Sequence, residues 1–114
     1  MQNVCQFFNV GKHNIVRLEN ADWNDGLDMA PDHGESVVFS CMYAHNMADM
    51  CAFLKELRKK RDSVTVMKEL VLLFDTIKDP VDYDDYKAKQ KRLSQYFDAI
   101  ERVSGNFVSI PIDK

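Results

Sequence analysis

Apolar residues recur along this chain every three or four positions, which is the spacing of a helix face that packs against a core. The clearest stripe lies between residues 35 and 60 and consists of Phe39, Tyr43, Met47, Met50, Leu54 and Leu57. Other apolar residues there, such as Val38, Cys41 and Ala48, lie outside the stripe. The pattern predicts one long helix over about residues 35–60. Because this helix is apolar nearly all round, it needs cover on most sides.

Two weaker stripes follow, separated by the interruption at Asp79-Pro80. The first predicts a helix over residues 63–78 and consists of Val66, Met67, Leu70, Val71, Phe74 and Ile77. The second predicts a more polar helix over residues 82–104 and consists of Tyr86, Leu93, Phe97, Ile100 and Val103.

The two ends of the chain complete the predicted fold. Residues 1–10 are spaced like the last turns of an amphipathic helix that Gly11 ends. Residues 107–112 alternate enough for one short extended segment, which Pro111 restricts to a sheet edge. We expect no second strand to pair with it. The predicted fold class is therefore all-α, with three to four helices and one short C-terminal extended segment.

The stretch over residues 20–29 has neither a helical nor a strand period, and Gly26 interrupts it. It contains Trp23, the only tryptophan in the chain. The residues that disfavour regular structure are Asp22, Asn24, Asp25 and Asp28. We expect an ordered loop whose tryptophan stacks on a ligand while the carboxylates point at it. The alternative is an acidic turn with one anchoring aromatic ring. His13, upstream, either orients a loop carboxylate or serves as a local hydrogen-bond partner.

Length and composition narrow the function classes. With 114 residues and 46% hydrophobic content, the chain suffices for one domain with a core. Its net charge of -3 gives no basic face for nucleic acid. We identify no signal peptide and no apolar run of the roughly 20 residues that a membrane span needs, so we expect a cytoplasmic protein without a membrane partner. Cys5, Cys41 and Cys51 are interpreted as buried free thiols in a reducing compartment.

The sequence predicts no metal site. Residues 22–26 begin like a calcium-binding loop, but the glycine comes one position early and glutamate is absent at the twelfth position. His33, Glu35 and His45 lack the i, i+4 spacing of a zinc-binding helix.

The string Ala21-Asp22-Trp23-Asn24-Asp25-Gly26-Leu27-Asp28 resembles the signature loop of the inverting glycoside phosphorylases. These enzymes, of the glycosyltransferase family 36 type, include cellobiose and chitobiose phosphorylases. The resemblance continues through Gly34-Glu35-Ser36-Val37 into the apolar helix and is fainter from Tyr86 to Asp113. The catalytic domain of that family is an (α/α)6 barrel of far more than 114 residues. The resemblance therefore implies an internal piece of such a barrel, whose partner is the remainder of the catalytic domain.

The resemblance also implies roles for the loop. The family's general acid, the second aspartate of the Asp-Trp-Asn-Asp string, corresponds to Asp25, and its sugar-contacting tryptophan corresponds to Trp23. Asp22 and Asn24 would support the loop through side-chain to backbone bonds. Inorganic phosphate is the co-substrate and nucleophile, so one protein carboxyl group suffices, and no cofactor is implied. The implied substrate is a β-linked disaccharide or oligosaccharide, cleaved to a sugar 1-phosphate.

Two positions depart from the family pattern and leave the identity of the sugar open. Asn20 stands where the cellobiose enzymes tend to have Arg and the chitobiose enzymes Gly, and Asp28 stands where Asn is usual. The family's phosphate-binding residues have no counterpart in this chain, so we expect the chain alone to be inactive and to self-associate through apolar surface. The alternatives are an inverting glycoside hydrolase on the same barrel and a non-catalytic helical interaction module.

Overall fold

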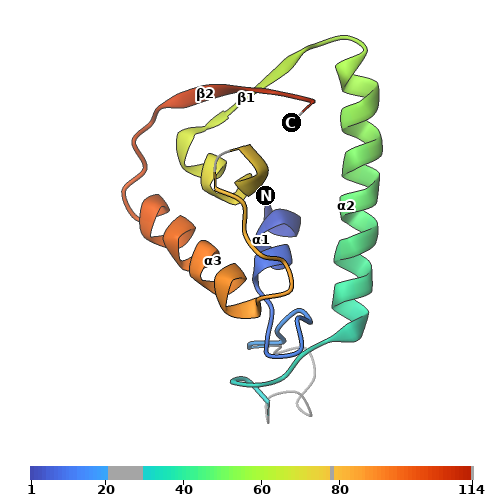
Figure 1. Ribbon diagram of the computed structural model, residues 1–114, viewed down its shortest axis with the longest axis vertical. Coiled ribbons are helices and arrows are strands. Elements are labelled where there is room, and N and C mark those ends of the chain that lie inside the picture. The colour runs from blue at the N-terminus through green and yellow to red at the C-terminus, as the bar shows by residue number, and fades with distance from the viewer. Residues whose placement is uncertain (21–29, 78, 114) are drawn as a thin grey trace.

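The computed structural model describes residues 1–20, 30–77 and 79–113. The elements are, in chain order, α1 (Gln2–Phe8), α2 (Val37–Arg58), β1 (Ser63–Met67), the 3-10 helices η1 (Lys68–Leu73) and η2 (Asp75–Ile77), α3 (Tyr86–Ile100) and β2 (Phe107–Pro111). Figure 1 shows α1, η1 and α3 grouped as a body, with α2 standing beside them as a long separate helix. The two strands cross the end of the molecule at which α2 finishes.

The core lies where α1, η1 and α3 meet. Its buried members are Val4, Phe8, Leu73, Leu93 and Tyr96. Helix α1 contributes two of them at a spacing of four residues, so both point to the same side of that short helix. Each large apolar side chain removed from water in this way contributes about 1.5–3 kcal/mol to folding. The body is therefore held by one small core to which three elements contribute.

Helix α3 turns a single face to this core. Asp85 caps its first turn by accepting the N–H of Lys87 at 2.9 Å. The buried residues Lys89, Leu93 and Tyr96 follow at intervals of four and three. The ammonium group of Lys89 lies 4.3 Å from the centre of the Phe7 ring, and burial lowers its pKa. Helix α3 thus buries one cation together with its apolar stripe.

Strands β1 and β2 show that the prediction of an all-α fold is wrong. They pair antiparallel, with Val64 opposite Ile110 and Val66 opposite Val108. The run Val64-Thr65-Val66 is β-branched at every position, which restricts the side chains and favours a strand over the helix predicted for residues 63–78. The C-terminal segment therefore has a partner in β1, contrary to expectation. The fold is mixed α/β.

Beyond β1, the chain forms 3-10 turns and a loop where the sequence predicted a continuous α-helix. Asp75 is 4% exposed, and its carboxylate accepts the N–H of Val81 and the hydroxyl of Tyr83, each at 2.9 Å. Such bonds from a side chain to a later segment compete with helix formation. They hold the end of η1 and η2 against residues 81–83. Burial, and then the bond to Asp75, raise the pKa of Tyr83.

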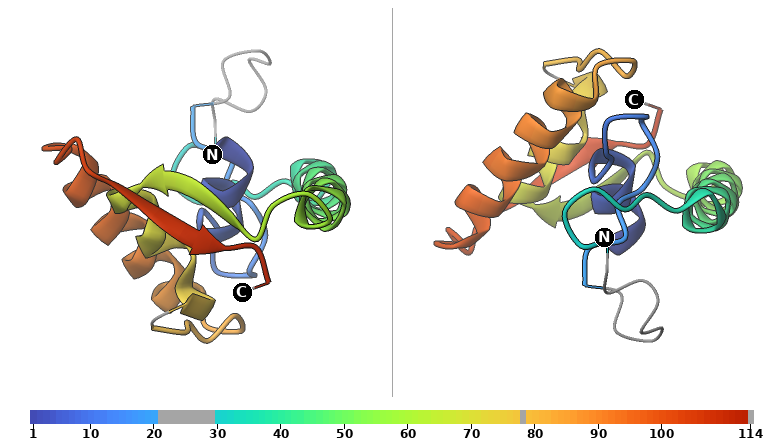
Figure 2. Two further views of the ribbon diagram at one scale, coloured as in Figure 1. Left: turned by 90° about the horizontal axis from the view of Figure 1, so that it is seen from above. Right: turned by 90° about the horizontal axis from the view of Figure 1, so that it is seen from below.

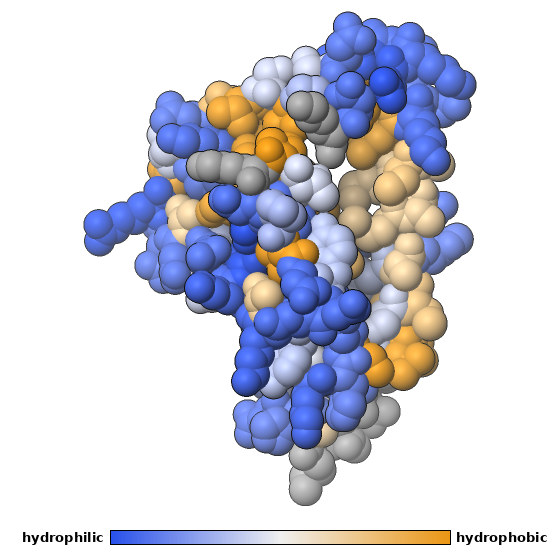
Figure 3. All heavy atoms as spheres, viewed as in Figure 1, coloured by the Kyte–Doolittle hydropathy of each residue, from blue (hydrophilic) through white to orange (hydrophobic). Residues whose placement is uncertain are grey.

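Helix α2 has a different environment, although its half-buried residues include the whole predicted stripe from Phe39 to Leu57. None of its 22 residues, all of which are described, is buried. Val38 and Phe53 are 75% and 64% exposed on its other faces. Figure 2 shows the helix displaced to one side of the body, and Figure 3 shows apolar residues along it. The stripe thus faces the body, while the remaining apolar surface stays uncovered.

Two further features of α2 bear on the predictions. Cys41 and Cys51 are exposed on it, so the expectation of buried thiols is wrong for both. Among the described residues, α2 is also the one helix long and apolar enough to cross a membrane by length and composition. One such helix is weak evidence for a membrane span, and the absence of a membrane partner stays a prediction.

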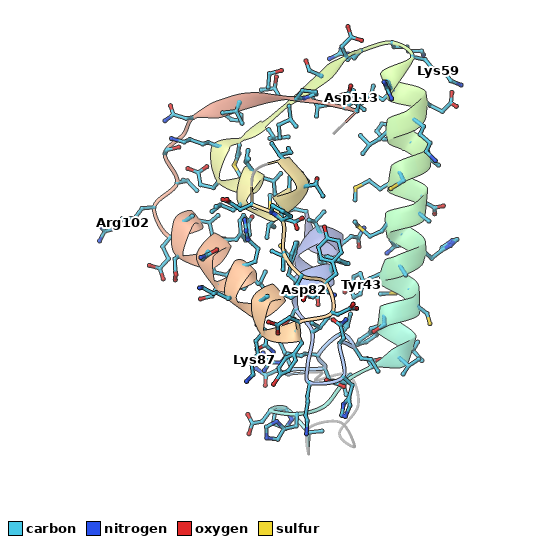
Figure 4. All side chains as sticks on the ribbon, in the orientation of Figure 1. Tyr43, Lys59, Asp82, Lys87, Arg102 and Asp113 are labelled. Carbon is cyan, nitrogen blue, oxygen red and sulfur yellow. The ribbon has the colours of Figure 1, made fainter. Side chains whose placement is uncertain are left out.

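The far end of α2 is tied to the rest of the chain by an ion pair. The guanidinium of Arg58 lies 3.9 Å from the carboxylate of Asp113, and both side chains are largely exposed. Figure 4 labels Asp113 and Lys59 at this end and Lys87 at the opposite end, near the start of α3. Because water screens such a pair, it adds little to stability.

Candidate functional site

Two short segments run antiparallel where the predicted signature loop leaves and rejoins the body. Leu18 N–H donates to the Gly34 carbonyl at 2.9 Å, and Ser36 N–H donates to the Val16 carbonyl at 2.8 Å. Between these bonds, Arg17 and Glu35 form an isolated antiparallel bridge. We call residues 16–18 and 34–36 the loop base. The loop base fixes the separation and direction of the two chain segments that carry the loop.

Backbone geometry at both sides of the loop base is closely constrained. A Cβ at position 34 would lie 2.5 Å from the Ala30 carbonyl oxygen, so only glycine fits there. That same oxygen accepts the Gly34 N–H at 2.8 Å. On the other side, Glu19 has a φ of 50°, in the left-handed region that few non-glycine residues adopt. The chain therefore turns sharply at both ends of the loop.

Helix α2 begins at the loop base and is fastened to it by two serines. Ser36 caps the helix, because its hydroxyl oxygen accepts the N–H of Phe39 at 3.1 Å. One turn later, the Ser40 hydroxyl donates to the Ser36 carbonyl at 2.9 Å and accepts the N–H of Val16 at 3.0 Å. The first turn of α2 thus contacts both segments of the loop base.

A tight turn over residues 10–16 leads into the loop base, and side chains of α3 bind this turn. Val10 and Val16 form an antiparallel bridge, and Gly11 N–H donates to the Ile15 carbonyl at 2.8 Å. The Gln90 side chain of α3 donates to the Val10 carbonyl at 2.7 Å. Lys89 donates to the Asn14 side chain at 2.8 Å. These contacts connect the turn to the core of the body.

His13 and Glu35 join this turn to the loop base. One oxygen of Glu35 accepts the His13 backbone N–H at 3.0 Å, and the other lies 2.8 Å from His13 Nδ1. The Glu35 side chain is 10% exposed and that of His13 is 73% exposed. Burial acts to raise the pKa of Glu35, but the hydrogen bonds and charge of His13 outweigh it and lower that pKa. The carboxylate therefore stays ionised to lower pH than an ordinary glutamate.

A polar cavity of about 460 Å³ opens beside the loop base. Its lining consists of Gly11, Lys12, His13, Arg17, Asp32, His33, Glu35, Tyr86 and Gln90. Cations, carboxylates, an amide and a phenol together offer donors and acceptors in several directions, which suits a ligand rich in hydroxyl groups. A more apolar cavity of about 570 Å³ lies between η1, α3 and β2, away from the loop base.

Residues 3–90 match the family model for the catalytic domain of the glycosyl hydrolase 94 superfamily. The chain belongs to this superfamily. The match covers the loop, its base and every residue that lines the polar cavity, and it ends inside α3. No curated protein matches the chain. Membership in glycosyl hydrolase 94 places the chain among the carbohydrate-active enzymes that cleave glycosidic bonds by hydrolysis or phosphorolysis.

The four loop residues predicted from the sequence fall within the glycosyl hydrolase 94 match but outside the described residues. They are Asp22, Trp23, Asn24 and Asp25. Their predicted roles as loop support, sugar contact and general acid stay predictions. Elsewhere, the described residues contain no group of three or more histidine, cysteine or acidic side chains that could hold a metal ion.

Sequence reasoning missed the pairing of His13 with Glu35 in this glycosyl hydrolase 94 domain. The sequence suggests either a loop carboxylate or a local hydrogen-bond partner for His13. Its partner instead follows the loop, 22 positions away. Neither a helical nor a strand period links two positions so far apart. The available signals were Gly11, close to the histidine, and the Gly34-Glu35-Ser36 string, but neither identifies the other as its partner.

Proposed function

We propose that this glycosyl hydrolase 94 domain takes part in the inverting phosphorolysis of a β-linked disaccharide or oligosaccharide, giving a sugar 1-phosphate. The observation that carries the proposal is the family match, which spans the whole Asp22–Asp25 string and the base from which the loop extends. The resemblance of that string to the signature loop of cellobiose and chitobiose phosphorylases supports phosphorolysis as the reaction. Inorganic phosphate is the co-substrate, and no cofactor takes part.

In this proposal, Asp25 is the general acid and Trp23 contacts the sugar. Asp25 donates its proton to the departing glycosidic oxygen while phosphate attacks the anomeric carbon from the opposite face, which inverts the configuration. A free aspartate titrates near pH 3.9 and is charged at neutral pH. A sugar-filled pocket that excludes water, with Asp22 and Asp28 nearby in the sequence, would raise the pKa of Asp25 toward the working pH.

The structure supports one requirement of this mechanism, a fixed platform for the loop. A general acid must lie within hydrogen-bond reach of the oxygen that it protonates, about 2.6–3.2 Å. The loop base is bonded to the first turn of α2 through Ser40 and, through the preceding turn, to Gln90 of α3. A loop carried on two helices is held more accurately than one that extends from coil.

We propose that the groups that bind phosphate, and most of those that bind the sugar, come from other parts of the catalytic domain. The exposed apolar surface of α2, including Val38, Met42 and Phe53, supports this, because such a surface needs cover. Activity therefore has to be measured in a catalytically competent form of the enzyme.

The test is Asp25→Asn, which removes the proton donor and keeps the shape of the side chain. We expect phosphorolysis of the natural donor to fall by about 10²–10⁴-fold with sugar binding largely kept. A glycosyl fluoride, whose leaving group needs little protonation, should lose much less. Asp28→Asn is the comparison variant: it removes a neighbouring carboxylate from the same loop but keeps the proton donor, so its loss should be much smaller than that of Asp25→Asn. Near-normal phosphorolysis by Asp25→Asn would show that Asp25 is not the acid.

The same assay separates phosphorolysis from hydrolysis on the same scaffold. We expect product formation to depend on inorganic phosphate and to yield a sugar 1-phosphate of inverted configuration. Cleavage at an unchanged rate without phosphate, giving the free sugar, would replace the proposal with that of an inverting hydrolase. A competent enzyme that neither binds nor cleaves sugars would favour a non-catalytic module.

A further inference from the structure

We propose that Glu35 is a positioning residue which, with Gly11 and His13, forms a latch that holds the loop base in place. The name base latch refers to these three residues. The effect of the latch on catalysis rests on the function proposed above, whereas the latch itself rests on contacts among the described residues. The two parts are tested separately.

Both oxygens of Glu35 are engaged by one residue, which fixes the orientation of the carboxylate as well as its position. The backbone N–H of His13 lies 3.0 Å from one oxygen, and Nδ1 of the same residue lies 2.8 Å from the other. Hydrogen bonds to an ionised acceptor are shorter and stronger than those between neutral groups. The Glu35 side chain is 10% exposed, so it has little room to adopt another arrangement.

Gly11 makes the close approach of Glu35 possible. A Cβ at position 11 would overlap Oε1 of Glu35 and would lie only 2.6 Å from its carboxyl carbon. Among the described glycines, only Gly105 has a positive φ, so the backbone at Gly11 would accept alanine. The restriction to glycine at this position therefore comes from the Glu35 carboxylate and not from the backbone conformation.

The base latch joins elements that the backbone bonds alone connect loosely. His13 lies in the turn that Gln90 and Lys89 of α3 hold, and Glu35 lies in the second segment of the loop base, next to the cap of α2. Without the carboxylate, the second segment is held against the first by two backbone bonds and the Ser40 hydroxyl, and no other hydrogen bond among the described residues ties it to His13. Its direction, and with it the direction of the loop, would then vary.

A contact that only stabilised the fold would lower the free energy of unfolding when it is removed and would not change the loop in the folded chain. The His13 side chain is 73% exposed, so water can take its place beside the Glu35 carboxylate when the contact is lost, which limits the change in the free energy of unfolding. Loss of the latch should therefore leave the chain folded while altering the loop. The stability of the fold and the environment of the loop therefore have to be measured separately.

The first experiment uses the chain itself and needs no activity. Trp23 is the only tryptophan, so its fluorescence reports on the signature loop alone. We expect Glu35→Gln, His13→Ala and Gly11→Ala each to change the emission maximum and the acrylamide quenching of Trp23, with the helical circular dichroism unchanged. The matched controls are Glu56→Gln and His45→Ala, which remove an exposed acid and an exposed histidine from ion pairs on α2. These controls should leave the fluorescence unchanged.

A double-mutant cycle tests whether Gly11 and Glu35 act together. Gly11→Ala should alter quenching of Trp23 strongly when Glu35 is present and hardly at all in a Glu35→Ala background, because the overlap is then relieved. Coupled residues give such non-additive effects, and independent residues give additive ones. Additive effects, or unchanged fluorescence in both Gly11→Ala and Glu35→Gln, would overturn the base latch.

The catalytic part is tested in the competent enzyme. We expect Glu35→Gln and Gly11→Ala to lower kcat by about 10–10²-fold at unchanged KM, because a misplacement of about 1 Å costs that much. The glycosyl fluoride, whose leaving group needs little protonation, should lose less than the natural donor, because the latch acts through the position of the Asp25 loop. Normal kcat in variants with altered fluorescence would overturn the positioning role. If the competent enzyme shows no phosphorolysis, the proposed function is refuted. The Trp23 fluorescence and the double-mutant cycle would still test whether the base latch exists.

Discussion

Helices α2 and α3 are both long, yet the more apolar of the two is the one that the body leaves uncovered. Helix α2 has no buried residue over Val37–Arg58, all of which are described, whereas the more polar α3 buries Lys89, Leu93 and Tyr96. Apolar residues occupy every face of α2, and a body on one side reaches only one of them. In α3 most of them lie on one face, which is covered, and Phe97 is the exposed exception. Burial thus follows the arrangement of apolar residues around the helix rather than their number.

The largest expected difference between the two helices comes from truncating one aromatic residue in each. Tyr96 of α3 is 2% exposed, and Phe53 of α2 is 64% exposed. We expect Tyr96→Ala to lower the free energy of unfolding by about 3–5 kcal/mol, because it leaves a cavity in the core. Phe53→Ala should change it by no more than about 0.5 kcal/mol. Urea unfolding followed by circular dichroism measures both. Equal losses would show that α2 is covered in solution.

A smaller effect separates the lysines of the two helices. Lys89 is 5% exposed and bonded to Asn14, whereas Lys55 of α2 is exposed. We expect Lys89→Met to lower the free energy of unfolding by about 1–3 kcal/mol, because the variant loses the charged hydrogen bond to Asn14 and the contact of the ammonium group with the Phe7 ring. Lys55→Met should leave it within about 0.5 kcal/mol of the parent value.

Lys89 also makes the free energy of unfolding depend on pH. Burial lowers the pKa of Lys89 in the folded chain, although Asp84 acts to raise it. Between this lowered value and the unfolded value near 10.4, the unfolded chain binds more protons, so the stability contributed by Lys89 rises with pH. The parent chain should therefore gain stability relative to Lys89→Met across that window. If the difference in the free energy of unfolding between the parent chain and Lys89→Met stays constant or narrows as pH rises, the pKa of Lys89 is not lowered in the folded chain.

The smallest expected effect concerns association. In a solution of the purified chain, a second copy is the one surface available to cover α2, and we expect self-association through its exposed apolar residues. Val38→Lys and Phe53→Lys should weaken this association by about tenfold or more, which corresponds to about 1.4 kcal/mol. Phe97→Lys on α3, at a side chain that is 49% exposed, is the control. Sedimentation velocity that shows a monomer for the parent chain at high concentration would rule out the association.

The sequence predicted the helices better than their surroundings. The stripe from Phe39 to Leu57 correctly identified the face of α2 that turns toward the body, because helical periodicity is a local property. The same reasoning failed over residues 63–78, where apolar spacing fits a helix but the β-branched run at Val64 favours a strand. Only a partner strand far along the chain decides between the two, and β2 supplies it.

The candidate site also has one part that the sequence predicted and one part that it did not. The string around Asp25 can be identified from the sequence because its residues are consecutive. The pairing of His13 with Glu35 could not be predicted, because it depends on how the loop base brings two distant positions together. Nor could Tyr96 be identified as a core residue, since the stripe assigned to α3 included its neighbour Phe97, which is half-exposed. An error of one position changes the side of a helix on which a residue lies.

The antiparallel pairing of β1 with β2 has a practical consequence for choosing the boundaries of expressed variants. The family match stops at residue 90, but β2 begins at Phe107. A variant cut to the matched residues would lose β2 and would leave β1 without its partner. An unpaired, valine-rich edge strand is a template for aggregation. Expression boundaries for this domain should therefore follow the sheet and include residues up to at least 111.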